Sequence, residues 1–114
     1  MKANPEIVIA YWRAAGIPKP VTEYKFAIVI GRKWRMDYAW PEKKLALEVQ
    51  GGIFIQGRHS RGAALLKEWE KLNTAASMGW RFLFCQPADI MKQPLVDTIK
   101  ASLKINLDTR LPKA

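Results

Sequence analysis

Two acidic residues, Asp37 and Glu48, are the side chains best placed for chemistry, because each lies in a short segment of alternating residues. Residues 34–40 and residues 44–50 both alternate with a period of two, as strands with two different faces do. The proline-containing segment between them is typical of a turn. Folding about that turn brings Asp37 close to opposite Glu48, and alternation allows both acids to project from one face with Gln50. The opposite face is expected to carry Trp34, Met36, Tyr38, Trp40, Leu45, Leu47 and Val49.

Two carboxylates held together among apolar strands repel each other, so such a pair usually needs a cation. Oxygen ligands of this kind suit Mg²⁺ or Mn²⁺, which keep bound waters and accept a phosphate oxygen. A metal ion there would activate a water and stabilise charge at phosphorus. The other interpretation is a set of ordinary ion pairs, Asp37 with Arg35 or Lys25 and Glu48 with a lysine. The spacing alone leaves both interpretations open.

The elements that position these acids follow from periodicity, capping residues and turn residues. In chain order they are a helix at 4–15, strands at 23–30, 34–40 and 44–50, a helix at 61–78, a strand at 80–85 and a helix at 90–103. The longest helix has one apolar stripe, formed by Leu65, Trp69, Leu72 and Ala76. We therefore predict an α/β fold of order αβββαβα. A meander, a crossover helix and a parallel fourth strand make a mixed four-stranded sheet flanked by helices.

Size and charge indicate one basic domain over residues 1–114, with a loose tail from about residue 106. The chain has 19 Lys and Arg against 10 Asp and Glu, a net charge of +9, and such domains commonly bind a polyanion. The longest apolar run, at 26–30, is far too short to cross a bilayer, and no signal-peptide pattern is present. The lone Cys85 is expected to be a buried thiol. We expect a cytoplasmic protein without membrane contact.

Several short motifs occur in order within residues 20–87, over half of the chain. They are Asp37-Tyr-Ala-Trp-Pro, Leu-Glu48-Val-Gln-Gly-Gly, Arg58-His59, Glu70-Lys71-Leu-Asn73 and Gly79-Trp80-Arg. With them the chain resembles the PD-(D/E)XK nuclease superfamily, and within it the very-short-patch-repair-like endonucleases and small phage and archaeal-type Holliday-junction resolvases. The resemblance implies a restriction-endonuclease-like core in which Asp37 and Glu48 are metal ligands. The pair of acids alone is a weak pattern, and the ordered combination is considerably more specific.

One position departs from the superfamily pattern. The lysine that is usual in the third motif is Gln50 here, an amide that can position a water but brings no positive charge. The resemblance implies a relocated lysine, and Lys71 is the first candidate because its long stem could reach the sheet face. Lys25 is the second candidate. The alternative for Lys71 is a surface ion pair with Glu68 or Glu70 on the same helix.

The superfamily also places an acid ahead of the hairpin, and two residues compete for that role. Glu23 has the same parity as Asp37 and is preferred as a third metal ligand. Glu6 lies in the first turn of a helix, where the helix dipole explains a carboxylate equally well. His59, the only histidine, is implied by the resemblance to assist at the scissile phosphate. Its alternative is an ordinary solvated loop residue.

Two basic groups are candidates for nucleic-acid binding. Arg58 and Arg61 flank the histidine loop and are expected to clamp phosphates, because guanidinium groups bind phosphate oxygens in pairs. Arg32, Lys33 and Arg35 lie on a neighbouring turn and would hold a duplex in register without reading its sequence.

The predicted function is a metal-dependent endodeoxyribonuclease that cuts branched, nicked or mismatched DNA in repair or recombination. The lack of an insertion for base readout favours recognition of DNA structure. Small size and abundant apolar surface suggest a homodimer. Two alternatives stay open: a DNA-binding module that retains the fold without catalysis, which Gln50 favours, and an RNA-processing nuclease. Of the tryptophans, Trp12, Trp69 and Trp80 are expected to lie in the core.

Overall fold

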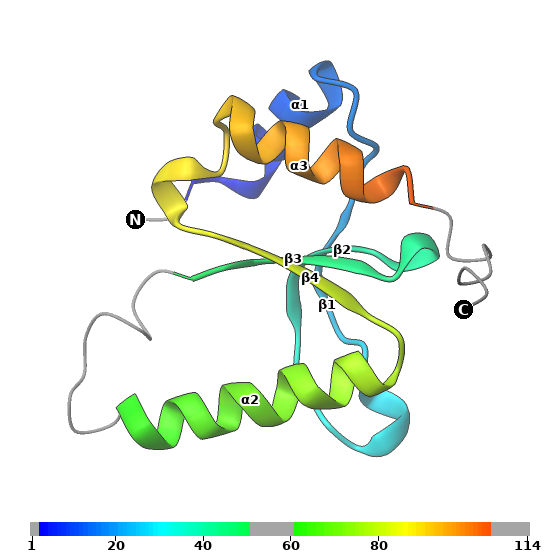
Figure 1. Ribbon diagram of the computed structural model, residues 1–114, viewed down its shortest axis with the longest axis vertical. Helices are drawn as coiled ribbons and strands as arrows, with labels where there is room; N and C mark the ends of the chain where they lie inside the picture. Colours follow the sequence, from blue (N-terminus) through cyan, green and yellow to red (C-terminus); the bar gives the residue numbers. More distant parts are fainter. Residues whose placement is uncertain (1–2, 51–60, 106–114) are drawn as a thin grey trace, which may run out of the picture.

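A four-stranded mixed sheet forms the centre of the computed structural model, which describes residues 3–50 and 61–105 (Figure 1). Its strands are β1 (Val21–Tyr24), β2 (Met36–Trp40), β3 (Leu45–Val49) and β4 (Arg81–Cys85), and they lie in that order. β1 and β2 are antiparallel, as are β2 and β3, whereas β3 and β4 are parallel. The helices are α1 (Pro5–Ala14), α2 (Arg61–Ser77) and α3 (Gln93–Leu103). The predicted α/β class and element order are confirmed.

The helices cover the sheet from both sides: α1 and α3 pack on one face, and α2 packs on the other (Figure 1). The α1/α3 side holds the larger cluster of buried side chains, which comprises Val8, Trp12, Ile17, Tyr38, Trp40, Leu45, Leu47, Ile90, Val96 and Ile99. The α2 side holds a smaller one, which comprises Phe26, Ala27, Met36, Ala39, Ala46, Ala75 and Trp80. Within the described ranges, no helix has the length and apolar character needed to span a bilayer.

The predicted strand at 23–30 is wrong in its second half. β1 ends at Tyr24, which pairs with Met36 at the start of β2. Beyond that point no strand among the described residues continues the ladder, so the β-branched residues lack a partner strand there. Instead the chain turns through a 3₁₀ segment, η1 (Ile28–Ile30), which Gly31 ends in the left-handed conformation with φ 79°.

The prediction that alternate residues of 34–40 share one face holds only for the later part of β2. Tyr38 and Trp40 lie in the α1/α3-side cluster, but Met36 lies in the α2-side cluster and Trp34 packs against it. The strand therefore changes face at Asp37. The residue opposite Asp37 on β1 is Glu23, whose φ of 52° is left-handed. The left-handed residue breaks the regular alternation of β1 at the same level of the sheet at which β2 changes face.

Helix α2 turns toward the sheet a face that overlaps the predicted apolar stripe only in part, since Leu65 and Leu72 are partly covered whereas Trp69 and Ala76 are exposed. Its most covered described positions include Ala64, Glu68, Lys71 and Ala75, which follow each other at spacings of three and four. Trp69, expected in the core, is 50% exposed. The stripe was misplaced because the underlying sheet is made of small residues at Ala39 and Ala46. Small side chains leave room there for the long side chains of polar residues.

Two tryptophans make a matched test of this arrangement. Trp12 is fully buried, and its Nε1–H donates a hydrogen bond to the Ile90 carbonyl over 3.0 Å. Replacing Trp12 by alanine should lower the free energy of unfolding by about 3–5 kcal/mol, because a large cavity remains. The same change at half-exposed Trp69 should cost less than about 1.5 kcal/mol. Urea unfolding of both variants measures the difference, and equal losses would contradict the placement of α2.

Candidate active site

Asp37 and Glu48 meet where the β2–β3 hairpin opens. The paired ladder stops at Tyr38 and Leu47, one residue short of the two acids. There each carboxylate bonds the backbone of the opposite strand. The Asp37 N–H donates to Glu48 Oε2 over 3.2 Å, and the Val49 N–H donates to Asp37 Oδ2 over 2.8 Å. The predicted proximity of the two acids is thus confirmed, and these side chains replace the missing backbone pairing.

Glu48 is a buried carboxylate with a lysine partner. It is 4% exposed, and its Oε1 accepts a hydrogen bond from Lys71 Nζ at 2.9 Å. Burial raises the pKa of Glu48 above its ordinary value, although the charge and hydrogen bond of Lys71 act to lower it. The negative charge of Asp37 raises it further. A cation at this place would therefore be favoured, because it offsets the cost of keeping two carboxylates ionised together.

Lys71 reaches this position from the opposite layer. It lies on the face of α2 that covers the sheet, and its side chain is only 11% exposed. Ala46, two residues before Glu48 on β3, belongs to the buried cluster on the α2 side, and the long stem of Lys71 lets its ammonium group reach Glu48 from that side. The surface ion pair considered for Lys71 does not form in the described structure, since Glu70 pairs with Arg32 instead. The structure thus places a positive charge beside Glu48.

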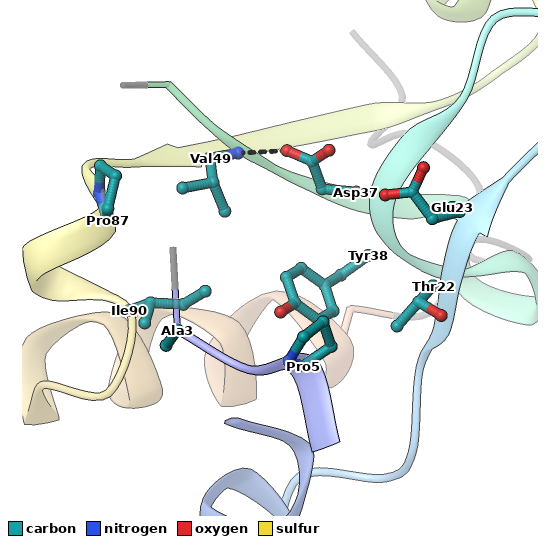
Figure 2. A pocket seen from close by; sticks show the side chains of 9 residues that line it. All are labelled: Ala3, Pro5, Thr22, Glu23, Asp37, Tyr38, Val49, Pro87 and Ile90. Carbon is teal, nitrogen blue, oxygen red and sulfur yellow. Dashed lines mark hydrogen bonds between the residues drawn. The ribbon is translucent and has the colours of Figure 1, made fainter. Parts of the chain in front are cut away.

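A small pocket opens beside Asp37 on the side of the sheet that faces α1 (Figure 2). Its volume is about 130 Å³, and its lining combines carboxylates at one rim with apolar walls. The lining residues are Ala3, Pro5, Thr22, Glu23, Asp37, Tyr38, Val49, Pro87 and Ile90. Figure 2 shows the hydrogen bond from the Val49 nitrogen to Asp37, with the Glu23 carboxylate at the same rim. The pocket therefore gives a small ligand access to Asp37 and Glu23, whereas Glu48 does not line it.

Glu23 was preferred over Glu6 as the third acid, and the structure brings Glu23 to the pocket that Asp37 lines. Its side chain is 56% exposed and forms an ion pair with Arg35 at 3.0 Å. The alternative in which Arg35 pairs with Asp37 is thereby replaced. Glu6 is exposed in the first turn of α1, where Asn4 Oδ1 accepts a hydrogen bond from its backbone N–H. It does not line the pocket.

Some of the other predicted site residues have side chains that the structure describes, and the rest do not. Gln50 directly follows β3, and its N–H donates to the Cys85 carbonyl over 2.8 Å. Lys25 is exposed beside Lys33 in a separate groove, so it is not brought to Asp37. Arg32 bonds Glu70 at 2.6 Å and lies over the Trp34 ring. Arg58 and His59 lie outside the described residues, and Arg61 begins α2 with only its backbone described.

The donor set fits a hard divalent cation in charge and chemistry. Asp37 and Glu48 together carry two negative charges against the one positive charge of Lys71, and oxygen ligands suit Mg²⁺ or Mn²⁺. Each bonded carboxylate oxygen keeps a second lone pair for a metal. In the part of the chain that the structure describes, no three acidic, histidine or cysteine side chains converge as a ready group of ligands. Two carboxylates with bound waters are the coordination that these residues support.

Glu68 is a residue that sequence reasoning weighed only as a partner of Lys71. Its Oε2 is buried and has no hydrogen-bond partner among the described residues. It lies one turn before Lys71 on the covered face of α2. The signal that could have found it is the spacing of Ala64, Glu68, Lys71 and Ala75, which marks one face of a helix. A polar pair on that face lowered the apolar contrast, so the neighbouring stripe was chosen instead.

Cys85, at the end of β4, is only half-buried, less than expected. Burial, followed by the negative charges of Asp89 and Asp37, raises the pKa of its thiol to about 11. At pH 8 about one thiol in a thousand is then ionised, so iodoacetamide should label the folded protein at least about a hundredfold more slowly than a free cysteine. Mass spectrometry of timed reactions measures this. Labelling as fast as that of urea-unfolded protein would show a reactive thiol instead.

Comparisons with known proteins provide a distant relationship. No family model and no solved structure matches the chain. Two uncharacterised proteins of Mycobacterium tuberculosis, MT2308 of strain CDC 1551 / Oshkosh and Rv2248 of strain ATCC 25618 / H37Rv, are each 29% identical to it over 82 residues. The match covers 69% of this chain and 28% of either relative. The chain thus spans little more than a quarter of the curated relatives it matches, and it is similar to one part of a longer protein.

Proposed function

We propose that this protein is a metal-dependent endonuclease whose active site consists of Asp37, Glu48 and Lys71. The observation that carries the proposal is the buried bond between Lys71 and Glu48, made where Asp37 and Glu48 brace the open end of the hairpin. Buried ionisable residues whose pKa is perturbed are commonly found at functional sites. The order of elements, with an antiparallel meander and a parallel β4 after α2, supports the further proposal of a restriction-endonuclease-like core.

Asp37 and Glu48 would hold Mg²⁺ or Mn²⁺, and Glu23 at the pocket rim is a candidate third ligand. Such an ion would lower the pKa of a water and stabilise charge at the phosphate. Lys71 stands within hydrogen-bond distance of Glu48, so its ammonium group can orient an attacking water or stabilise the developing negative charge. It thereby takes the role of the motif lysine that Gln50 cannot fill. The net charge of +9 favours a nucleic acid as substrate.

The substrate class is proposed to be branched, nicked or mismatched DNA. The test incubates the protein with Mg²⁺ or Mn²⁺ and a labelled four-way junction, a flap, a nicked duplex, a plain duplex and an RNA hairpin. Metal-dependent cleavage of the branched or nicked DNA is the expected result. Binding without cleavage in any metal would favour the non-catalytic DNA-binding module, and preferential cutting of the hairpin would favour RNA processing. A homodimer and a cytoplasmic location stay predictions, and sedimentation at micromolar concentration tests the first.

A further inference from the structure

Three consecutive aliphatic residues form an exposed tip at the η1 turn between β1 and β2. Ile28 is 62% exposed, Val29 87% and Ile30 53%. In Figure 1 this turn lies at the α2 side of the sheet, away from α1 and α3. Single exposed apolar residues are common on proteins, but a contiguous group usually marks a binding surface. The tip therefore needs a partner that accepts aliphatic side chains.

The turn that carries these residues is anchored by buried neighbouring residues and by backbone hydrogen bonds. Phe26 and Ala27, which precede it, are 7% and 0% exposed. The Ala27 carbonyl accepts hydrogen bonds from the backbone N–H groups of Ile30 and Arg32, each over 3.1 Å. Arg32 also bonds Glu70 of α2 at 2.6 Å. Insertion of a rigid tip into a partner loses little conformational entropy.

Basic residues surround the tip. A groove beside it is lined by Lys25, Arg32 and Lys33 together with Ile28 and Gly31. Lys25 and Lys33 are exposed, and neither forms an ion pair with another described residue. Two unpaired cations next to an apolar tip are complementary to a partner that offers phosphates beside an apolar interior. DNA has both, because its stacked bases lie between two phosphate backbones.

We propose that the η1 tip is a wedge that inserts between unstacked bases of DNA, while Lys25 and Lys33 contact the flanking phosphates. The inference rests on the DNA substrate of the proposed function and adds how that substrate is recognised. Apolar side chains of this type are inserted between base steps by proteins that kink DNA, at the cost of unstacking. That cost is lowest where stacking is already interrupted, at a nick or a junction. The wedge would therefore select distorted DNA without reading its sequence.

The test measures binding in EDTA, so that it does not depend on cleavage. A nicked duplex carries 2-aminopurine beside the nick, and a plain duplex carries it at the same position. The wild-type protein should raise the fluorescence of the nicked duplex. The variant with Ile28→Ser, Val29→Ser and Ile30→Ser should lose that rise and bind nicked DNA at least about tenfold more weakly. The matched control is Ile7→Ser on α1, which is 59% exposed and should change neither measurement.

The lysines have a separate signature. Lys25→Ala and Lys33→Ala should each reduce the slope of log affinity against log salt by about 0.9, with binding weakened on nicked and plain duplex alike. Urea unfolding of every variant checks that the fold is retained. Wild-type binding to nicked DNA without a fluorescence rise would overturn the wedge and leave the nuclease proposal standing.

The nuclease proposal can also fail while the wedge stands. A rise that depends on the tip in a protein that never cleaves would keep the wedge and sink the nuclease. Absence of any DNA binding would overturn both. Vesicles containing an anionic lipid form the last arm, because an apolar tip with basic neighbours also suits a membrane surface. Binding to vesicles that requires the tip, with no effect of the tip on DNA, would overturn the wedge in favour of a lipid partner.

Discussion

Asp37→Asn is expected to abolish metal-dependent cleavage while leaving DNA binding intact. The asparagine keeps an oxygen that can accept the hydrogen bond from the Val49 N–H, so the open end of the hairpin should stay in place. It removes the negative charge that holds a divalent cation. A metal ion contributes several kcal/mol of transition-state stabilisation. Its loss should therefore lower the cleavage rate by about a thousandfold or more.

Single-turnover cleavage of the preferred DNA measures this loss, and a thermal shift in Mn²⁺ adds a reading that does not need activity. The wild-type protein should be stabilised by Mn²⁺, since a ligand that binds only the folded state raises its stability. Asp37→Asn should lose that shift. The matched control is Glu42→Gln, because Glu42 is an exposed acid in the turn at the opposite end of the hairpin. Undiminished cleavage by Asp37→Asn would remove Asp37 from the site.

Lys71→Met is expected to lower the rate of cleavage by about 10²–10³-fold with little change in DNA affinity. Methionine preserves most of the stem that packs against the sheet but removes the ammonium group that bonds Glu48. The expected loss corresponds to removing one preorganised donor from a site where negative charge develops. The matched control is Lys67→Met, an exposed lysine one turn earlier on α2. Equal losses in the two variants would mean that α2 acts only through its general positive charge.

A second substitution distinguishes a chemical role of Lys71 from a structural one. Gln50 directly follows β3, two residues after Glu48, at the position where the superfamily that the sequence resembles carries its lysine. Gln50→Lys in the Lys71→Met background should restore at least about tenfold of the lost rate, because it returns one positive charge to the site. If Lys71 only stabilised the fold, a lysine at position 50 would not restore the rate. A double variant with the activity of Lys71→Met would leave Lys71 as a structural partner of Glu48.

The stability of the Lys71→Met variant should also depend on pH in a defined direction. The substitution removes the ammonium group of Lys71, whose charge is the largest influence that lowers the pKa of Glu48. The pKa of Glu48, which burial already raises, therefore rises further. An acid whose pKa is raised on folding contributes stability that is fully present below its unfolded pKa and is lost as pH rises through the folded one. Breaking a buried pair can cost about 3–5 kcal/mol at neutral pH. The variant should therefore lose more stability at pH 8 than at pH 5, and urea midpoints of variant and wild-type protein at both pH values measure the difference.

Most of the fold was accessible from local patterns. Alternation placed β2 and β3, the Asn4-Pro5 start placed α1, and the turn at η2 (Pro41–Lys43) made Asp37 and Glu48 neighbours. Patterns failed where tertiary context overrides propensity. The β-branched run at η1 has no strand to pair with, and it became an exposed turn. Trp69 was placed in the core by its helical stripe but is 50% exposed.

The sequence by itself determined which residues form the hairpin and therefore that two acids stand opposite each other, because strand register follows from alternation and turn position. It determined neither the rotation of α2 nor the face change of β2. Lys71 becomes the partner of Glu48 only because small residues beneath α2 allow that helix to turn a charged residue inward. Asp37 lines the pocket at the point where β2 changes face, opposite the irregular residue Glu23 of β1. Both outcomes depend on contacts between distant segments, which local periodicity cannot specify.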